Sequence, residues 1–398
     1  MIAPALGPSS RRIFSTADAK RFARRRLPRL VFDFLEGGVG SEVALASNRA
    51  AFDAVKLQPR VLRDVAVRDL GTEFLGKAYS LPFGIAPMGM CNLTHPSADD
   101  ILTGLAGAAN IPFCVSTAAS TVLEQVFEWM PETWFQLYVG QSQDAGFAMA
   151  DRAKAAECTT LVLTVDTPHI SRRVRDLRNG FQVPFKIGAK QALDFALHPA
   201  WSLAMLQCVT KHGLPRPGNF DPEDGGFKRD EPRAGATWEF LAKLRDRWPG
   251  QLIIKGVLSP KDARRIQSLG ADAIWVSNHG GRQLDSVMPA IDVLPAIREA
   301  TGPDMPLLLD SGIESGEDIV KALALGADFV MLGRPWMYAL GAEGSQGSVS
   351  LARILADEQS ITMAQVGATS ISEITSQVLA SQHLAEDLNL ASRLRQVT

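Results

Sequence analysis

Eight short apolar runs recur along this chain of 398 residues, and each of them ends at a polar or glycine-bearing turn. In chain order they are Leu81–Ala86, Pro112–Ser116, Trp134–Val139, Thr160–Asp166, Leu252–Lys255, Ala273–Ser277, Leu307–Asp310 and Phe329–Leu332. Runs this short and apolar are typical of strands that are covered on both faces. Because helical patterns lie between most of them, the series predicts an α/β fold in which eight parallel strands close into a (β/α)8 barrel, the TIM barrel.

A repeat within the chain supports the barrel. Gly256-Val-Leu-Ser-Pro-Lys-Asp leads to Leu269-Gly-Ala-Asp, and Gly312-Ile-Glu-Ser-Gly-Glu-Asp leads, at the same spacing, to Leu325-Gly-Ala-Asp. Each unit therefore predicts a turn, a helix, a second turn and a strand. The competing architecture is a doubly wound open sheet, but no Gly-x-Gly-x-x-Gly motif follows the first strand.

The segments outside this series predict the rest of the organisation, which we expect to be one domain over residues 1–398. Residues 1–70 indicate a helical cover at the N-terminus, and residues 338–398 indicate closing helices. Between the fourth and fifth strands, residues 174–237 are rich in proline, glycine and asparagine and predict a long insertion or lid. Within it, residues 193–209 form one apolar, helix-like stretch.

Composition argues against several classes of function. The net charge of −2 gives no general attraction to nucleic acid, so we expect no nucleic-acid partner. The four cysteines lie far apart with no C-x-x-C pair, which predicts no metal site and favours a reduced, cytoplasmic setting. No run of about 18 apolar residues is present, so we expect no segment to span a bilayer.

The active site of a (β/α)8 barrel lies at the carboxyl ends of its strands, and polar residues follow these strands throughout the series. The densest group is Ser277-Asn-His-Gly-Gly-Arg282. A lone histidine is more often a core residue than a catalyst, but the glycines that follow His279 permit close approach of a ligand to the main chain. His279 can accept a proton near neutral pH, and Arg282 can bind a carboxylate through two parallel hydrogen bonds.

Other strand ends extend this group. Asp166 is suited to orient His279 and to stabilise its protonated form, and Arg173 would be a second clamp on a carboxylate. His169 has no partner at the spacing of a metal ligand. The turns Asp310-Ser-Gly312 and Gly333-Arg334 suit a phosphate, because glycine turns and helix N-termini form anion pockets at this place in such barrels.

At these residues the chain resembles the FMN-dependent L-2-hydroxy acid oxidases and dehydrogenases, the family of glycolate oxidase, L-lactate dehydrogenase and mandelate dehydrogenase. The resemblance runs from about residue 14 to about residue 375. Its most specific strings are Ser277-Asn-His-Gly-Gly-Arg-Gln-Leu-Asp285, Phe135-Gln-Leu-Tyr138, Leu163-Thr-Val-Asp-Thr-Pro168 and Lys321-Ala-Leu-Ala-Leu-Gly-Ala327. Several such strings in the same order argue against chance similarity.

The resemblance implies FMN as the cofactor and a role for each matching residue. His279 would be the catalytic base and Asp166 its partner. The substrate would be bound by Tyr138, Arg173 and Arg282. FMN would be held by Pro87, Met88, Gly89, Ser116, Gln136, Thr164, Lys255, Ser277, Asp310, Gly312, Gly333 and Arg334. A cation such as Lys255 beside the flavin ring stabilises negative charge there.

Two positions depart from the family pattern. Phe34 stands where the family usually has a tyrosine that touches the substrate carboxylate, so one hydrogen bond, worth about 1–3 kcal/mol if buried, is lost. Glu314 stands where the family has an arginine at the FMN phosphate, and a carboxylate repels a phosphate. Gly89 and Ala118 are small where some relatives carry bulkier residues, which leaves room for a larger substrate side chain.

The function implied is oxidation of an L-2-hydroxy acid to the 2-oxo acid, with a quinone, another electron carrier or O2 as the acceptor. The string Leu197-His-Pro-Ala-Trp-Ser-Leu203 is similar to mandelate and lactate dehydrogenases of bacterial membranes. It implies a peripheral membrane contact through residues 193–209, on the cytoplasmic side; an apolar helix packed on the barrel is the alternative. We expect a homo-oligomer, a tetramer as in the family.

Two alternative functions remain open at this point. Phe34 leaves room for an FMN barrel that oxidises an alcohol or an amine without a free carboxylate. Glu314 leaves room for a barrel that binds flavin or phosphate without catalysis.

Overall fold

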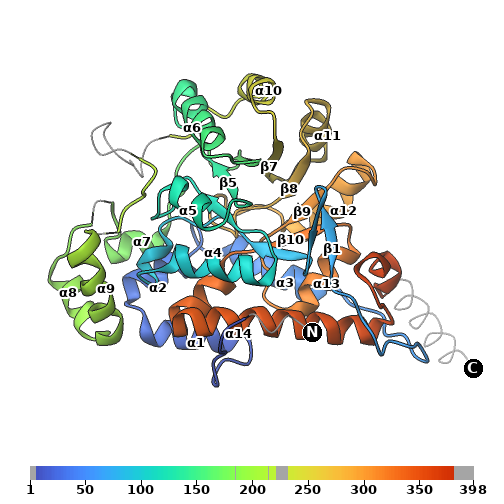
Figure 1. Ribbon diagram of the computed structural model, residues 1–398, viewed down its shortest axis with the longest axis horizontal. Coiled ribbons are helices and arrows are strands. Elements are labelled where there is room, and N and C mark those ends of the chain that lie inside the picture. Colours follow the sequence, from blue (N-terminus) through green and yellow to red (C-terminus); the bar gives the residue numbers. More distant parts are fainter. Residues whose placement is uncertain (1–5, 184, 214, 221–231, 381–398) are drawn as a thin grey trace, which may run out of the picture.

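The computed structural model describes residues 6–183, 185–213, 215–220 and 232–380 (Figure 1). Its main sheet has eight strands in the order β3-β10-β9-β8-β7-β6-β5-β4, and every pair is parallel. The strands are β3 (Phe83–Ile85), β4 (Cys114–Ser116), β5 (Trp134–Leu137), β6 (Thr160–Thr164), β7 (Gln251–Val257), β8 (Ala273–Val276), β9 (Leu307–Leu309) and β10 (Phe329–Leu332). Seven of the eight predicted runs each contain one strand, and the run Leu252–Lys255 lies within the longer β7.

A single parallel bridge between Ile85 and Phe113 joins the two outer strands of this order, and the Ile85 N–H donates to the Pro112 carbonyl at 2.9 Å. The sheet thus closes on itself, which confirms the predicted barrel and rules out the open sheet. The strands are buried along nearly their whole length, as their apolar composition predicts.

A hairpin of β1 (Thr72–Phe74) and β2 (Lys77–Tyr79) lies against the interior of the barrel. The ring of Phe74 is 5.2 Å from Phe329 and 6.1 Å from Trp134, both near the amino ends of their strands. The hairpin therefore plugs the amino-terminal end of the barrel. The opposite end, where the strands finish, remains for a site.

The repeat seen in the sequence forms two matching βα units. Ser259 and Ser315 each cap the helix that follows, accepting a hydrogen bond from the N–H three residues on. These helices are α11 (Pro260–Ser268) and α13 (Gly316–Ala324). The aspartates of the two Leu-Gly-Ala-Asp turns, Asp272 and Asp328, each accept the main-chain N–H at a neighbouring strand, both at 2.7 Å.

The helices that complete the units are α4 (Ala98–Ala109), α5 (Leu123–Trp129), α6 (Gln143–Ala155), α10 (Trp238–Arg247), α12 (Ala290–Thr301) and α14 (Arg334–Val366). The N-terminal helices are α1 (Thr16–Arg26), α2 (Arg29–Glu36) and α3 (Val43–Ala54). α1 lies along α14 across one side of the molecule (Figure 1). α14 bends at Glu343 and Gly344, which have non-helical backbone angles.

Between β6 and β7 the chain forms α7 (Val174–Asn179), α8 (Ala189–Ala196) and α9 (Pro199–His212). The apolar stretch 193–209, expected as one helix-like segment, is divided between α8 and α9. Pro199 explains the break, because proline disfavours helical angles at the residue before it and suits the first turn of a new helix. α8 and α9 project at one end of the molecule (Figure 1).

None of the helices in the described residues is both long and apolar enough to cross a bilayer.

Candidate active site

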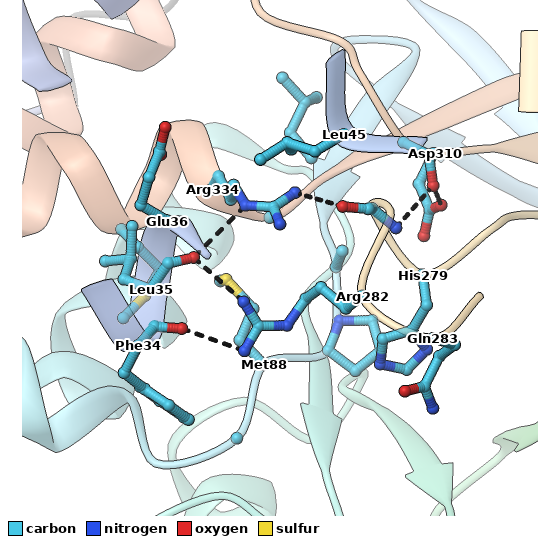
Figure 2. Close-up of a pocket in the computed structure, with 18 of the residues that line it drawn as sticks. Phe34, Leu35, Glu36, Leu45, Met88, His279, Arg282, Gln283, Asp310 and Arg334 are labelled. Carbon is cyan, nitrogen blue, oxygen red and sulfur yellow. Dashed lines mark hydrogen bonds between the residues drawn. The ribbon is translucent and has the colours of Figure 1, made fainter. Parts of the chain in front are cut away.

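A cavity of about 550 Å³ opens at the carboxyl ends of the strands. Figure 2 shows part of its lining, with His279, Asp310 and two arginines around the space. Among the residues expected at the site, those that line this cavity are Pro87, Met88, Gly89, Ser116, Tyr138, Thr164, Arg173, Lys255, His279, Arg282, Asp310, Gly312, Gly333 and Arg334. The volume falls within the range of small-molecule and cofactor sites.

His279 follows β8 and lies between a carboxylate and the cavity. Its Nδ1 is 3.1 Å from Oδ1 of Asp166, and its Nε2 is 3.4 Å from the Tyr138 hydroxyl. The carboxylate accepts a hydrogen bond from Nδ1–H, so the lone pair of neutral His279 is on Nε2, which faces Tyr138. His279 has a left-handed φ of 58°, and Gly280 and Gly281 continue at 63° and 71°.

The surroundings keep His279 unprotonated near neutral pH. Burial lowers its pKa, and the charges of Lys255 and Arg173 lower it too, against the raising effect of Asp166. For Asp166, burial alone would raise the pKa, but His279 and Lys255 outweigh burial and hold the pKa below its ordinary value. The pair is therefore a neutral imidazole held by a carboxylate, which is the state a general base requires.

Asp166 reaches His279 because the neighbouring strand has no side chain at the point of contact. A Cβ atom on Gly256 would lie 2.5 Å from Cβ and Cγ of Asp166, and Gly256 has a φ of +103°. The β7–β8 register also shifts between Lys255 and Val257. This irregularity lets the Asp166 side chain pass between β7 and His279.

Lys255 forms a second charged group at the floor of the cavity. Its ammonium lies 2.7 Å from the Ser277 hydroxyl and 2.8 Å from Asp310. Burial would lower the pKa of Lys255, but the carboxylates of Asp310 and Asp166 outweigh it and raise that pKa. Lys255 therefore stays charged although its side chain is only 5% exposed.

Two buried polar atoms near Lys255 have no hydrogen-bond partner within the part of the chain that the structure describes. They are the Nε2 amide of Gln136 and the Oγ1 hydroxyl of Thr164. Buried polar groups in proteins are nearly always paired, so such atoms indicate a ligand that pairs with them. A flavin ring, with carbonyl and N–H groups along its pyrimidine edge, fits these donors and the cation of Lys255.

The other end of the cavity lies at the N-terminus of α14, where Gly333 and Arg334 follow β10. Arg334 donates to the carbonyls of Gly280 at 2.8 Å and of Leu35 and Gly37 at 3.3 Å (Figure 2). A helix N-terminus with an arginine fits a phosphate. This end fits FMN apart from one residue, Glu314, which lines the same cavity.

Glu314 is half-buried, and burial raises its pKa against the opposing charges of Lys20 and Arg49. Lys20 pairs with Glu36 at 2.6 Å, and the Tyr338 hydroxyl donates to the same carboxylate. All of these side chains line the cavity. The phosphate end thus contains two carboxylates among its cations.

Arg282 lines the cavity beside α2. Its terminal nitrogens donate to the main-chain carbonyls of Phe34 at 3.0 Å and Leu35 at 3.3 Å (Figure 2), and to that of Gly37 at 2.7 Å. The Phe34 ring stacks on Phe181 at 4.3 Å, so an apolar wall stands where the family pattern has a hydroxyl. Arg173 enters the cavity from the loop after β6.

Three of the expected site residues, Asp166, Gln136 and Ser277, do not line the cavity but lie directly behind it. Gln136 accepts from the Ser116 hydroxyl at 2.9 Å. Ser277 accepts from Lys255 and from the His279 N–H, at 2.7 and 3.0 Å. Through these hydrogen bonds the residues hold the lining of the cavity in place.

Several residues of the site were not anticipated. Asn48 of α3 exchanges two amide hydrogen bonds with Asn278, at 2.6 and 2.9 Å, and so fixes the N-terminal cover to the loop of the base. The sequence feature that could have indicated this contact is the polar pair Asn48-Arg49 in the otherwise largely apolar helix α3. Arg233 lines the cavity from the insertion, where its position in an irregular segment gave no signal.

None of the described residues forms a cluster of three or more histidine, cysteine, aspartate or glutamate side chains suited to a metal ion.

Known proteins share both the sequence and the fold of this chain. (S)-Mandelate dehydrogenase of Pseudomonas putida is 38% identical over 94% of this chain and 95% of its own length. L-Lactate dehydrogenase of Pseudomonas syringae is 38% identical over 92% of this chain and 98% of its own. The crystal structure of the monotopic membrane protein (S)-mandelate dehydrogenase superposes with a TM-score of 0.88 at 38% identity, covering 93% of this chain and all of that one.

A crystal structure of mandelate oxidase covers 92% of this chain and 98% of its own, with a TM-score of 0.79 at 35% identity. The family model for FMN-dependent dehydrogenases matches residues 23–381. The resemblance noted in the sequence is thereby confirmed, and the chain belongs to the FMN-dependent dehydrogenase family.

Proposed function

We propose that this protein oxidises an L-2-hydroxy acid to the corresponding 2-oxo acid, with His279 as the base. The observation that carries the proposal is the imidazole of His279, which contacts Asp166 on one side and is directed towards Tyr138 on the other. Relatives named for mandelate and lactate, each matched over nearly its full length, support this class of substrate.

FMN, when bound, supplies the acceptor for the two electrons that leave the substrate. The chain's own part begins with Arg173 and Arg282, whose guanidinium groups neutralise the substrate carboxylate. For Arg282 this requires the carboxylate to compete with main-chain carbonyls, or to approach another of its N–H groups.

Proton removal falls to His279. Its Nε2 takes the proton, and the resulting imidazolium is stabilised by Asp166 through Nδ1–H. Burial raises the pKa of Tyr138, so its hydroxyl remains protonated and can donate to the substrate. Lys255 keeps a positive charge at the floor of the cavity, where negative charge accumulates during the reaction.

The test is the visible spectrum of the purified protein under anaerobic conditions. We expect a bound flavin that bleaches on addition of an L-2-hydroxy acid and not of its D-enantiomer. Bleaching by simple alcohols or amines alone would indicate the alternative substrate class that Phe34 suggests. A protein that binds flavin and is bleached by no compound of either kind would be a binding protein.

For the electron acceptor and the location, we propose a quinone at a membrane surface. Four leucines in or directly after α8 and α9 are largely exposed: Leu193, Leu197, Leu203 and Leu206 are 59–70% exposed. A groove beside them is lined by Arg24, Arg29, Arg175 and Arg178. Leucines next to arginines suit the boundary of an anionic bilayer, and a monotopic membrane protein superposes on this fold.

Flotation with vesicles that contain anionic phospholipid tests this. The triple variant Leu197→Asp, Leu203→Asp, Leu206→Asp should lose vesicle binding and reduction of a quinone dissolved in the bilayer, while its flavin still bleaches with substrate. Leu62→Asp is the matched control, because Leu62 is fully exposed in the loop before β1. Equal flotation of the triple variant and the parent would contradict the proposal.

A further inference from the structure

The base lies in a run of three consecutive residues with left-handed backbone angles. His279, Gly280 and Gly281 have φ values of 58°, 63° and 71°. Only glycine adopts such angles without strain, and residues in this region normally occur singly. The run lies outside the helices and strands, so its main-chain N–H groups need acceptors from elsewhere. The groups that accept from them therefore determine where the imidazole lies.

Two serine hydroxyls accept hydrogen bonds from the main chain at the base and on both sides of it. The Ser311 hydroxyl accepts from the N–H of Asn278 at 3.3 Å and from the N–H of Gly280 at 2.9 Å. The Ser277 hydroxyl accepts from the His279 N–H at 3.0 Å. Of the two hydroxyls, that of Ser311 thus fixes the main chain both before and after the base.

One ion pair orients both hydroxyls. The Lys255 ammonium donates to the Ser277 hydroxyl at 2.7 Å, and the Ser311 hydroxyl donates to Oδ1 of Asp310 at 2.6 Å. Oδ2 of Asp310 lies 2.8 Å from the Lys255 ammonium. A continuous network of hydrogen bonds therefore runs from the cation at the floor of the cavity to the turn that carries His279. Lys255, Asp310 and both serines are buried, so solvent competes little for these bonds.

The Ser311 hydroxyl has no hydrogen bond left for a ligand. A serine hydroxyl donates once and accepts twice, and Ser311 already uses all three bonds. Ser277 differs, because it accepts from Lys255 and His279 and has no acceptor for its own proton among the described residues. Although Ser311 lines the cavity, its hydroxyl therefore serves the main chain around the base and not a bound molecule.

Ser311 also adopts a conformation that is unfavourable for serine. Its φ is 78°, in the left-handed region, where a glycine would be free of strain. Strained residues persist where the surrounding contacts fix them, and they are concentrated at functional sites. A serine differs from a glycine here by its Cβ atom, which causes the strain, and by its hydroxyl, which holds the turn. The hydroxyl is therefore the group that a function at this position would require.

We propose that Ser311 is a positioning residue for the base, because its hydroxyl, oriented by the Lys255–Asp310 ion pair, holds the turn that directs Nε2 of His279 towards Tyr138. The inference rests on the proposed function, in which His279 removes the proton. Without the hydroxyl, two main-chain N–H groups lose their acceptor and the turn can relax. A displacement of about 1 Å costs on the order of 10²-fold in rate, so flavin reduction should slow by about 10- to 100-fold.

The experiment separates the hydroxyl from the backbone strain. Ser311→Ala removes the hydroxyl and keeps the Cβ atom, whereas Ser311→Gly removes the hydroxyl and also relieves the strain. Both variants should slow anaerobic flavin reduction by an L-2-hydroxy acid by about 10- to 100-fold. Their Kd values for FMN and for the 2-oxo acid product, measured from the flavin absorbance, should stay within about threefold of the parent. A misplaced base predicts this loss of rate without loss of binding, and a general loosening of the site does not.

Two other serines provide controls. Ser259 caps α11 and does not line the cavity, so Ser259→Ala should lower the midpoint of thermal unfolding and leave flavin reduction unchanged. Ser277→Ala removes a hydroxyl that still has a proton to donate, so it should weaken FMN binding as well as slow reduction. The Ser311 variants should differ from both, since only they lose rate and keep the affinity for FMN.

Two results would overturn the inference while the proposed function stands. One is reduction at the parent's rate in either Ser311 variant, which would show that the hydroxyl is not needed. The other is a loss of FMN affinity as large as the loss of rate, which would assign Ser311 to the cofactor. If no L-2-hydroxy acid bleaches the flavin of the parent, the proposed function fails and this inference fails with it.

Discussion

The two ends of the active-site cavity differ in how well their charges are matched. Around His279 two carboxylates have close, fixed partners: Asp166 lies 3.1 Å from the imidazole, and Asp310 lies 2.8 Å from Lys255. At the N-terminus of α14, Arg334 donates to main-chain carbonyls, and Glu314 stands where the family pattern has an arginine. The first end therefore determines the chemistry, and the second determines how tightly the phosphate is held.

This difference has a physical basis. A base that is misplaced by about 1 Å loses on the order of 10²-fold in rate, so every contact of His279 counts. A phosphate can be held by helix dipoles, main-chain N–H groups and several cations, which substitute for one another. An unfavourable residue is consequently tolerated at the phosphate end and not beside the base.

The largest expected effect is on flavin reduction, from a change at the base that leaves the phosphate end unaltered. His279→Gln should slow flavin reduction by about 10²- to 10⁴-fold, the contribution of a general base, and leave the Kd for FMN unchanged. Stopped-flow reduction and flavin titration measure the two quantities. Reduction within a factor of about three of the parent would remove His279 from its role.

Asp166→Asn should have the next effect, about 10²-fold on flavin reduction. In the parent, burial lowers the pKa of His279 below 6.5, so the acid limb of kcat/KM should lie below pH 6.5. Asp166 raises that pKa, so its neutralisation should move the limb to still lower pH. A limb that stays in place or moves to higher pH would contradict the assigned pairing.

At the phosphate end, Glu314→Arg should tighten FMN binding by about 10- to 100-fold, the worth of a charge-assisted hydrogen bond. The Kd for riboflavin, which has no phosphate, should not change. Glu314→Gln is the control that removes the repulsion without adding a cation. Its Kd for FMN should lie between those of the parent and of Glu314→Arg. An equal change for FMN and riboflavin would show that Glu314 does not act on the phosphate.

The smallest effect is a pH dependence. Burial raises the pKa of Glu314, so the charged form that repels the phosphate is lost as the pH falls through that raised value. FMN affinity should therefore improve a few-fold from neutral towards acidic pH, relative to Glu314→Gln. The ionisation of the phosphate itself is common to both proteins and cancels. Identical pH profiles would contradict the prediction.

The barrel could be predicted because its strands are short, apolar and regularly spaced. The repeat predicted a turn, a helix, a second turn and a strand in each unit, and the structure shows that it also contains the capping residues Ser259 and Ser315 and the aspartates Asp272 and Asp328. The insertion was predicted less well. Its apolar run suggested one helix-like segment, but Pro199 divides that run into two helices.

The site was predictable as far as strand ends specify it. Lys255 lies in β7, and His279 and Arg334 follow β8 and β10 within three residues, so the barrel brings them to one face. Lys20, Asn48 and Arg233 come from the N-terminal cover and the insertion, whose packing depends on contacts remote in sequence. No spacing rule connects such residues to a strand end, and only the folded chain reveals them.

His279, Gly280 and Gly281 form a turn with left-handed backbone angles, so the conformation that positions the catalytic histidine also affects the free energy of unfolding. Left-handed angles cost a residue with a side chain about 1–2 kcal/mol, which glycine avoids. The two glycines cannot be given side chains cheaply, since a Cβ atom on Gly281 would lie 2.6 Å from the main chain of Leu45. The strain at His279 is therefore retained: a glycine there would relieve about 1–2 kcal/mol of it, but would leave the Asp166 carboxylate without its partner, at a cost of about 3–5 kcal/mol if the pair is fully buried.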